Sequence, residues 1–401
     1  MTQTLDRGDR VTRSAGSIRY CRRCVMPETK PDLHIDEQGV CNACRSYERR
    51  AQVDWDARLA ELMQLLERYR SKDGSNYDCI VPVSGGKDST FQTLKIKEWG
   101  FNPLCVTSTT CHLTELGRIN IENLKSRGVD YIEYTTNPVV RRKINRIGLR
   151  QIGDLSWPEH LTIFTIPVST AVKMNIPLLI WGENSQNEYG GPAADSENNV
   201  LNRRWLEEFG GLLGLRVTDL IGQEGITKRD LIAYTYPSDD ELKRVGVTGL
   251  FLGYFLQWDG YANALYAQAH GMRTYPTAIE GSMVNYENMD NAQTGIHDYF
   301  KFLKFGFSRT TDFACLHIRR GRLRRSDGIS IVRERDGKFP WTYLGYKIED
   351  ILRDIDVSLD EFISICDRYT NKRLFVCDAR GNPVKDSQGN LTKINYDNAD
   401  S

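Results

Sequence analysis

A short run of glycine, lysine, aspartate and hydroxyl residues stands where an apolar stretch ends. It reads Ser84-Gly85-Gly86-Lys87-Asp88-Ser89-Thr90 and directly follows YDCIVPV (77–83). Two glycines let the backbone turn sharply, so that successive N–H groups and the N-terminus of the next helix face one anion. Lys87 adds a cation, and the carboxylate of Asp88 beside a phosphate favours a bound Mg²⁺. The run predicts a polyphosphate-binding loop, although it lacks the spacing of a Walker loop and the Gly-x-Gly-x-x-Gly of dinucleotide-binding folds.

Four cysteines near the N-terminus have the spacing of a metal site. Cys21-x-x-Cys24 and Cys41-x-x-Cys44 are separated by sixteen residues. Each Cys-x-x-Cys places two thiolates on one side of a tight turn, and two such turns complete a tetrahedron around Zn²⁺. Four thiolates leave no open position, so we expect a structural zinc ribbon. Two unrelated cysteine pairs are the alternative.

Polar residues also follow a second apolar stretch, IPLLIW (176–181). They include Gly182, Glu183, Asn184 and Tyr189. Ligands of open parallel sheets bind at the carboxyl ends of strands, so this segment is a candidate for the nucleotide or acceptor site. A capped solvent loop is the alternative.

An indole and an imidazole stand at an expected helix start, in GDLSWPEH (153–160). Trp157 is a candidate substrate contact. His160 is a candidate to orient or deprotonate a nucleophile, because imidazole changes its protonation near neutral pH. Packing or helix capping would explain His160 equally well.

Alternating strands and helices must position these residues. The pattern predicts strands over 77–83, 101–109, 130–134, 176–181 and 248–253, and helices over 55–70, 87–99, 114–127, 158–175 and 260–270. Alternation at this spacing predicts an α/β protein with a parallel sheet and helices on both faces. The stretch 182–226 is interpreted as a long insertion, and 326–375 as helical.

We divide the chain into five parts. They are a flexible leader (1–18), the zinc ribbon (19–50), a linking helix (51–75), the nucleotide-binding α/β domain (76–275) and a mostly helical C-terminal region for substrate or partner (276–401).

Charge and composition exclude some classes of protein. The chain has 53 Lys and Arg and 53 Asp and Glu, so no overall field attracts it to nucleic acid or an anionic membrane. The first ten residues lack the apolar core of a secretion signal, and the most apolar window is broken by lysine and proline. We therefore expect a cytoplasmic protein with no membrane contact and with reduced cysteines.

The run SGGKDS after a buried strand resembles the signature of the PP-loop ATP pyrophosphatase superfamily. The resemblance implies a Rossmann-like fold of the PP-loop/HUP type and attack of a substrate oxygen on the α-phosphate of ATP. It implies that ATP contacts the residues Ser84, Gly85, Gly86, Lys87, Asp88, Ser89 and Thr90, together with Gly182 and Asn184. Lys87, Asp88, His160 and Glu183 are then the catalytic candidates.

Several further blocks resemble one family, the N-acetyl sugar amidotransferases of surface-polysaccharide biosynthesis of the LPS O-antigen type. The blocks are CRRCVMP, GVCNAC, SGGKDS, GDLSWPEH, WGENSQNEYGG, HDYFKFLKFGF and the Arg-rich stretch that follows. The resemblance implies that ATP and ammonia convert the acetamido group of a nucleotide-linked sugar into an acetamidino group. It also implies a separate glutaminase partner, since no cysteine of this chain has the setting of a glutaminase nucleophile.

The same resemblance makes a basic segment a candidate for the sugar nucleotide. Residues 299–325 contain eight Lys or Arg and one Asp, a charge that suits a diphosphate; a solvated basic face is the alternative. The candidate substrate contacts are Trp157, Tyr189, Asp259, His297, Lys304, Arg309 and Arg319.

Two other functions stay open. A tRNA-thiolating enzyme of the PP-loop type would need further reactive cysteines, and Cys111 after the second strand is the candidate. A zinc-ribbon nucleic-acid-binding protein would use the ribbon and the basic segment without ATP turnover.

Overall fold

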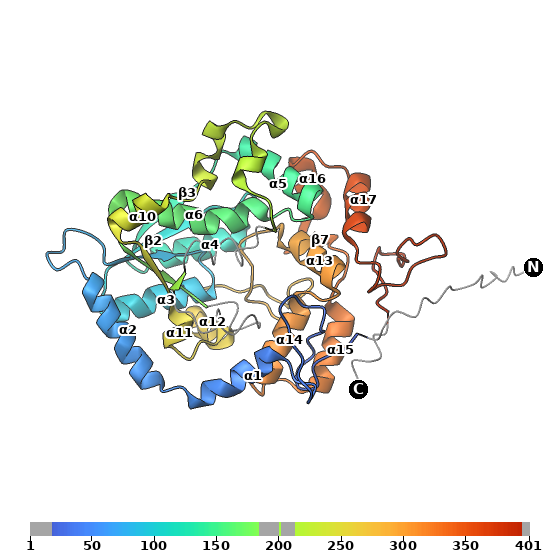
Figure 1. Cartoon of the computed structure of the whole chain (residues 1–401), viewed down its shortest axis with the longest axis horizontal. Coiled ribbons are helices and arrows are strands. Elements are labelled where there is room, and N and C mark those ends of the chain that lie inside the picture. The colour runs from blue at the N-terminus through green and yellow to red at the C-terminus, as the bar shows by residue number, and fades with distance from the viewer. Residues whose placement is uncertain (1–17, 184–199, 202–212, 395–401) are drawn as a thin grey trace, which may run out of the picture.

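The computed structural model describes residues 18–183, 200–201 and 213–394. The core of the fold is a six-stranded sheet with the strand order β3-β2-β1-β4-β6-β5. Figure 1 shows this sheet between helices α6 and α3. The strands are β1 (Cys79–Pro82), β2 (Pro103–Ser108), β3 (Asp130–Tyr134), β4 (Leu178–Trp181), β5 (Val200–Leu201) and β6 (Thr248–Phe251).

Five of these strands are parallel, as the sequence predicts. β1 pairs with β2 and β4, β2 with β3, and β4 with β6, all in parallel register, whereas β5 adds an antiparallel edge. The chain places β2 and β3 on one side of β1, and β4 and β6 on the other. The carboxyl ends of β1 and β4 therefore flank the switch point at which open α/β sheets bind ligands.

Alternate strand residues enter two separate apolar clusters, so helices cover both faces. Cys79 and Val81 pack with Leu62 and Ile96 on one face, and Ile80 packs with the helix that covers the other. The helices of the first face are α2 (Trp55–Tyr69), α3 (Lys87–Glu98) and α4 (Glu115–Lys125), and α6 (Trp157–Met174) covers the second.

One helix that the sequence analysis does not assign is α5 (Pro138–Ile152). The side chain of Asn137 accepts a hydrogen bond of 3.0 Å from the backbone N–H of Val139, and Pro138 occupies the first turn, where its missing N–H costs nothing. Gly153 ends the helix with a φ of +59°, in the left-handed region that favours glycine. The next residue, Asp154, is thereby set between α5 and α6.

Residues 213–245 comprise the described end of the predicted insertion and the segment after it. They pack on α5 and α6 through Leu220, Ile226 and Leu231. They consist of short turns of helix: η2 (Val217–Leu220), η3 (Gln223–Gly225), η4 (Lys228–Tyr234) and α10 (Asp239–Val245). After β6 come α11 (Leu252–Phe255) and α12 (Gly260–Ala269), and α12 lies against α3 with the rings of Phe91 and Tyr266 5.4 Å apart.

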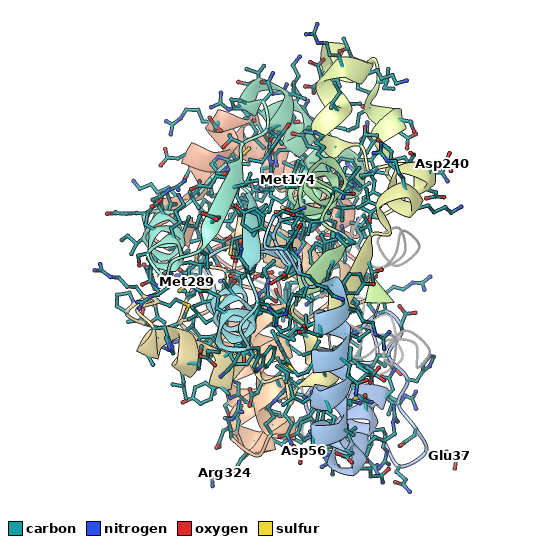
Figure 2. The ribbon with its side chains drawn as sticks, turned by 90° about the vertical axis from the view of Figure 1, so that its left-hand side faces the viewer. Glu37, Asp56, Met174, Asp240, Met289 and Arg324 are labelled. Atoms are coloured by element: carbon teal, nitrogen blue, oxygen red, sulfur yellow. The ribbon has the colours of Figure 1, made fainter. Side chains whose placement is uncertain are left out.

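The cysteine segment packs against the C-terminal region rather than against the sheet. It continues into α1 (Asn42–Arg49) and η1 (Arg50–Gln52), and its apolar side chains share a cluster with α14 (Arg309–Arg319) and α15 (Arg325–Arg335). Figure 1 shows this blue segment beside α14 and α15. In Figure 2, Glu37, Asp56 and Arg324 all lie at one end of the molecule, so the segment, the start of α2 and the start of α15 are at the same end.

Helices are the main regular elements of the C-terminal region, although they cover fewer than half of its described residues. A second large core joins Leu149 and Leu155 to Phe300, Leu352 and Phe362, and so attaches this region to α5. Its remaining elements are α13 (Thr294–Phe305), the hairpin β7 (Thr342–Tyr343) and β8 (Tyr346–Lys347), α16 (Ile348–Asp354) and α17 (Leu359–Tyr369). None of the helices in the described part of the chain combines the length and the apolar run needed to cross a bilayer.

Candidate functional site

A cavity of about 660 Å³ opens where the sheet meets the C-terminal region. The loop Ser84–Ser89 after β1 forms one wall, with Glu183 after β4 beside it. The segment Tyr286–Asp290 and one face of α13 form the opposite wall. The cavity therefore lies at the switch point of the sheet, where the sequence predicts the nucleotide.

The loop after β1 has the geometry of an anion site. Gly85 has a φ of +80°, and a Cβ there would lie 2.8 Å from the backbone N of Ile121, so only glycine fits. Ser84 N–H donates to Ser89 Oγ (3.3 Å), which holds the loop against α3. Gly86 is the N-cap of α3 and makes no side-chain cap hydrogen bond. Lys87, Asp88 and Ser89 at the start of α3 line the cavity, so the partial positive charge of the helix N-terminus lies at its wall.

Lys87 is 8% exposed and surrounded by carboxylates. Its Nζ pairs with Asp88 and Glu287, and Asp88 Oδ1 accepts a hydrogen bond of 2.8 Å from Asn263 Nδ2. Burial alone lowers the pKa of Lys87, but Asp88, Glu287 and Glu183 outweigh burial and hold that pKa well above its usual range. The ammonium therefore stays charged at neutral pH.

Three carboxyl groups of the cavity wall take up protons unusually readily. Burial, with the charge of Asp88, raises the pKa of Glu183 to about 7. Burial and the charge of Asp88 also raise the pKa of Glu287 against the opposing effect of Lys87, and burial raises the pKa of Asp290 to about 6. Groups with a pKa in this range are able to exchange protons at neutral pH.

Asp154 joins two histidines in the same cavity. His160 Nδ1 and His297 Nδ1 each lie 3.1 Å from a different oxygen of the Asp154 carboxylate, and the two rings meet edge to face with centroids 4.8 Å apart. Burial by itself raises the pKa of Asp154, but His160 and His297 reverse this and hold it well below its usual range. The carboxylate is therefore ionised and shared by the two imidazoles.

The basic side chains of α13 and α14 have partners within the chain. Arg309 donates from Nε and Nη2 to the two carboxylate oxygens of Asp298 (2.9 and 2.8 Å), and Lys301 pairs with Asp312. Lys304 Nζ donates to two backbone carbonyls at the end of α5 (2.7 and 3.0 Å). This part of the basic segment is therefore not a solvated face; it is folded into the cavity wall.

The four predicted cysteines converge. Cys21 Sγ and Cys44 Sγ are 3.9 Å apart, and Cys24 Sγ and Cys41 Sγ are 3.8 Å apart, with all four side chains fully buried. Four sulfurs about 2.3 Å from one Zn²⁺ lie about 3.8 Å from each other, whereas a disulfide needs about 2.05 Å. The cluster is therefore compatible with a tetrahedral zinc site.

Two arginines lie beside this cluster. The charges of Cys24 and its neighbouring cysteines outweigh burial and raise the pKa of Arg319, and Arg325 Nε donates to the backbone carbonyl of Cys24 (3.0 Å). Zinc with four thiolates carries two negative charges, so nearby guanidinium groups stabilise it. Arg319, predicted as a substrate contact, lies here and does not line the cavity.

Most of the other predicted site residues do line the cavity. They are Ser84, Gly85, Gly86, Lys87, Asp88, Ser89, His160, Glu183, His297, Lys304 and Arg309. Thr90 is fully buried behind the loop, and Gly182 packs against the ring of Trp258. Asn184 and Tyr189 lie outside the described residues.

Two predicted substrate contacts lie elsewhere. Trp157 is fully buried in the apolar cluster between α5 and α6 and does not reach the cavity. Asp259 begins α12 and pairs with Arg322, in a narrow pocket that shares Lys87 and Asp88 with the main cavity. No cysteine lines the main cavity among the residues that the structure describes.

The sequence analysis did not select the residues that hold Lys87, Asp88 and His160 in place, which are Glu287, Asn263 and Asp154. Asp154 has a weak signal, since it stands in GDLSWPEH close to His160. Glu287 and Asn263 have none, because each contacts Lys87 or Asp88 only through the folding of segments far apart in the chain.

Comparison with known proteins supports a polysaccharide role. Residues 280–385 match the family model described as "LPS biosynthesis protein WbpG-like, C-terminal domain". None of the curated proteins compared with the chain matches it. The matched segment supplies Glu287, His297, Lys304 and Arg309 to the cavity. Over this segment, about a quarter of its length, the chain is therefore similar to proteins of LPS biosynthesis, and the segment forms a large part of the wall of the candidate site.

Proposed function

We propose that this chain is an ATP-dependent amidotransferase of surface-polysaccharide biosynthesis. It adenylates the acetamido oxygen of a nucleotide-linked N-acetyl sugar, and ammonia then displaces AMP to give the acetamidino sugar. Pyrophosphate and AMP are the other products. Ammonia comes from a separate glutaminase partner.

One observation supports this proposal above the others. The Gly-rich loop after β1 and the segment similar to WbpG-like proteins face each other across one cavity, joined by the ion pair between Lys87 and Glu287. A volume of about 660 Å³ is within the range of roughly 300–1,000 Å³ for small-molecule sites. A nucleotide at the loop and an acceptor on the opposite wall would therefore share a single enclosure.

The residues of the loop fit a triphosphate. The N–H groups at the start of α3 and the ammonium of Lys87 would hold the departing pyrophosphate, and Asp88 would hold a Mg²⁺ ion that neutralises the phosphate oxygens when bound. Such electrostatic stabilisation is the main contribution that proteins make to phosphoryl transfer.

The reaction needs ATP because an amide oxygen is a poor leaving group. In the proposed reaction this oxygen bonds to the α-phosphorus while the bond from that phosphorus to pyrophosphate breaks. Ammonia then bonds to the amide carbon, the carbon–oxygen bond breaks, and the original amide oxygen leaves on AMP. The attacking nitrogen loses a proton in this step. Glu183, which lies in the cavity wall with a pKa raised to about 7, would accept that proton.

The four-cysteine cluster would hold a structural Zn²⁺, because its thiolates leave no coordination position for a substrate. The zinc ribbon would then fix the base of α14 and α15. Of these two helices, α14 carries Arg309 and Asp312 of the cavity wall.

The test incubates the whole chain with ATP, Mg²⁺, ammonium and a panel of UDP- and CMP-linked acetamido sugars. AMP release that depends on one sugar, with a product in which NH replaces O, supports the proposal. Turnover with glutamine in place of ammonium by the pure chain would contradict the proposed partner.

A further inference from the structure

The cluster of Asp154, His160 and His297 has the donor set of a metal site. It combines two imidazole nitrogens with one carboxylate, and the donor atoms all lie within 4.8 Å of one another. Ligand atoms about 2.1 Å from a shared ion lie roughly 3–3.5 Å apart. The distances of 3.1 Å from each imidazole Nδ1 to the carboxylate match that spacing.

The fold holds these three side chains rigidly. Asp154 Oδ1 accepts a hydrogen bond of 2.9 Å from the backbone N–H of Ser156, and the side chain of Asp154 is only 3% exposed. A Cβ on Gly148 would lie 2.5 Å from the carbonyl oxygen of Asp154, so the end of α5 packs tightly against this residue. His160 lies in the first turn of α6 and His297 in the first turn of α13.

The open side of the cluster faces the cavity. The side chains of His160 and His297 are 24% and 30% exposed and, with Asp154, line the 660 Å³ cavity. Two histidines and a carboxylate occupy one face of an ion and leave positions for a substrate or water on the other. This differs from the closed cysteine cluster, which buries every ligand.

We propose that Asp154, His160 and His297 bind a divalent transition-metal ion, with Zn²⁺ as the reference, whose open positions take an oxygen ligand in the cavity. The carboxylate and imidazole set suits first-row divalent ions. If the chain is the proposed amidotransferase, the ion would polarise the carbonyl oxygen of the acceptor as a Lewis acid. That use rests on the proposed function; the metal site itself does not.

The experiment counts zinc in the whole chain after loading with Zn²⁺ and desalting, with no nucleotide or sugar present. The variants are Cys41→Ser, His297→Ala, and the two combined. His270→Ala, at the residue that follows α12 and outside the lining of the cavity, is the matched control. We expect about two zinc ions per chain in the wild type and in His270→Ala, about one in each single variant and none in the double variant.

A wild-type chain that holds only the ion removed by Cys41→Ser would overturn the proposal, as would a His297→Ala variant with the wild-type zinc content. We expect His160→Ala and Asp154→Asn to lower the zinc content to about one ion per chain, as His297→Ala does. Circular dichroism checks that each variant is folded. Because ATP is absent, failure here leaves the proposed amidotransfer untouched. Failure of the amidotransfer assay, conversely, does not change the zinc count.

Discussion

Lys87 at the start of α3 and Glu287 in the segment before α13 form a largely buried ion pair in the wall of the central cavity, with side chains 9% and 15% exposed. Lys87 belongs to the Gly-rich loop, and Glu287 belongs to the segment similar to WbpG-like proteins. The pair therefore joins the two parts of the proposed enzyme at the point where phosphate would bind.

Replacement of Lys87 tests the role of the loop. Lys87→Ala removes the cation that would balance the departing pyrophosphate, and we expect pyrophosphate release to fall by about 10²–10³-fold. Lys95→Ala on the same helix is the matched control, because Lys95 pairs with the neighbouring Glu98 and does not line the cavity. Equal rates in the two variants would show that Lys87 has no part in the reaction.

Removal of the proposed structural zinc should loosen one end of the molecule. Cys41→Ser breaks the four-sulfur cluster that packs on α14 and α15, and we expect faster proteolysis within residues 18–50 together with a lower melting temperature. Cys377→Ser, a half-buried cysteine outside the cluster, should leave both unchanged. An unchanged proteolysis pattern in Cys41→Ser would contradict a structural metal.

The half-buried carboxyl group of Glu183 predicts how the stability of the fold depends on pH. Burial raises the pKa of Glu183 from 4.5 to about 7, so the folded chain resists its ionisation. The contribution of Glu183 to the free energy of unfolding should therefore be largest below about pH 4.5. It should be lost as pH rises through about 7. Glu183→Gln should flatten that fall in denaturant titrations. Glu61→Gln, at an exposed position of α2, should not.

Replacement of Asp298, the ion-pair partner of Arg309, should lower the stability of the fold. Asp298→Asn leaves the guanidinium of Arg309 without its ionised partner in a largely buried place, and we expect a loss of about 3 kcal/mol of unfolding free energy. Asp327→Asn breaks the exposed pair with Arg324 and should cost less than about 1 kcal/mol. Thermal and denaturant unfolding of both variants measures the difference. Equal losses would contradict a buried role for Arg309.

The parallel sheet could be predicted because each buried strand is a short apolar run between turn residues, and periodicity is a local property. The predicted strand over 130–134 and the helix from Lys87 are found with nearly the same bounds. The cysteine cluster could be predicted because its spacing is itself the geometry of the site. In each case residues close in sequence decide the structure.

The rest of the site depends on contacts between distant segments. Glu287 beside Lys87, and His297 beside Asp154, follow only once α13 packs across the end of the sheet. Trp157 was predicted to contact substrate because it is an aromatic residue in a polar block. Its ring instead fills the apolar core between α5 and α6. Helix α5 was readable from Asn137 and Pro138, the cap and first-turn residues that precede its apolar stripe.

The most direct test of the account measures AMP formation by the wild-type chain with ATP, Mg²⁺ and ammonium, in the presence and absence of each nucleotide-linked acetamido sugar. The account predicts that AMP and pyrophosphate form in equal amounts only with an acceptor sugar, and that the sugar gains nitrogen in place of oxygen. Release of ADP and phosphate instead, or AMP formation that no sugar changes, would contradict it.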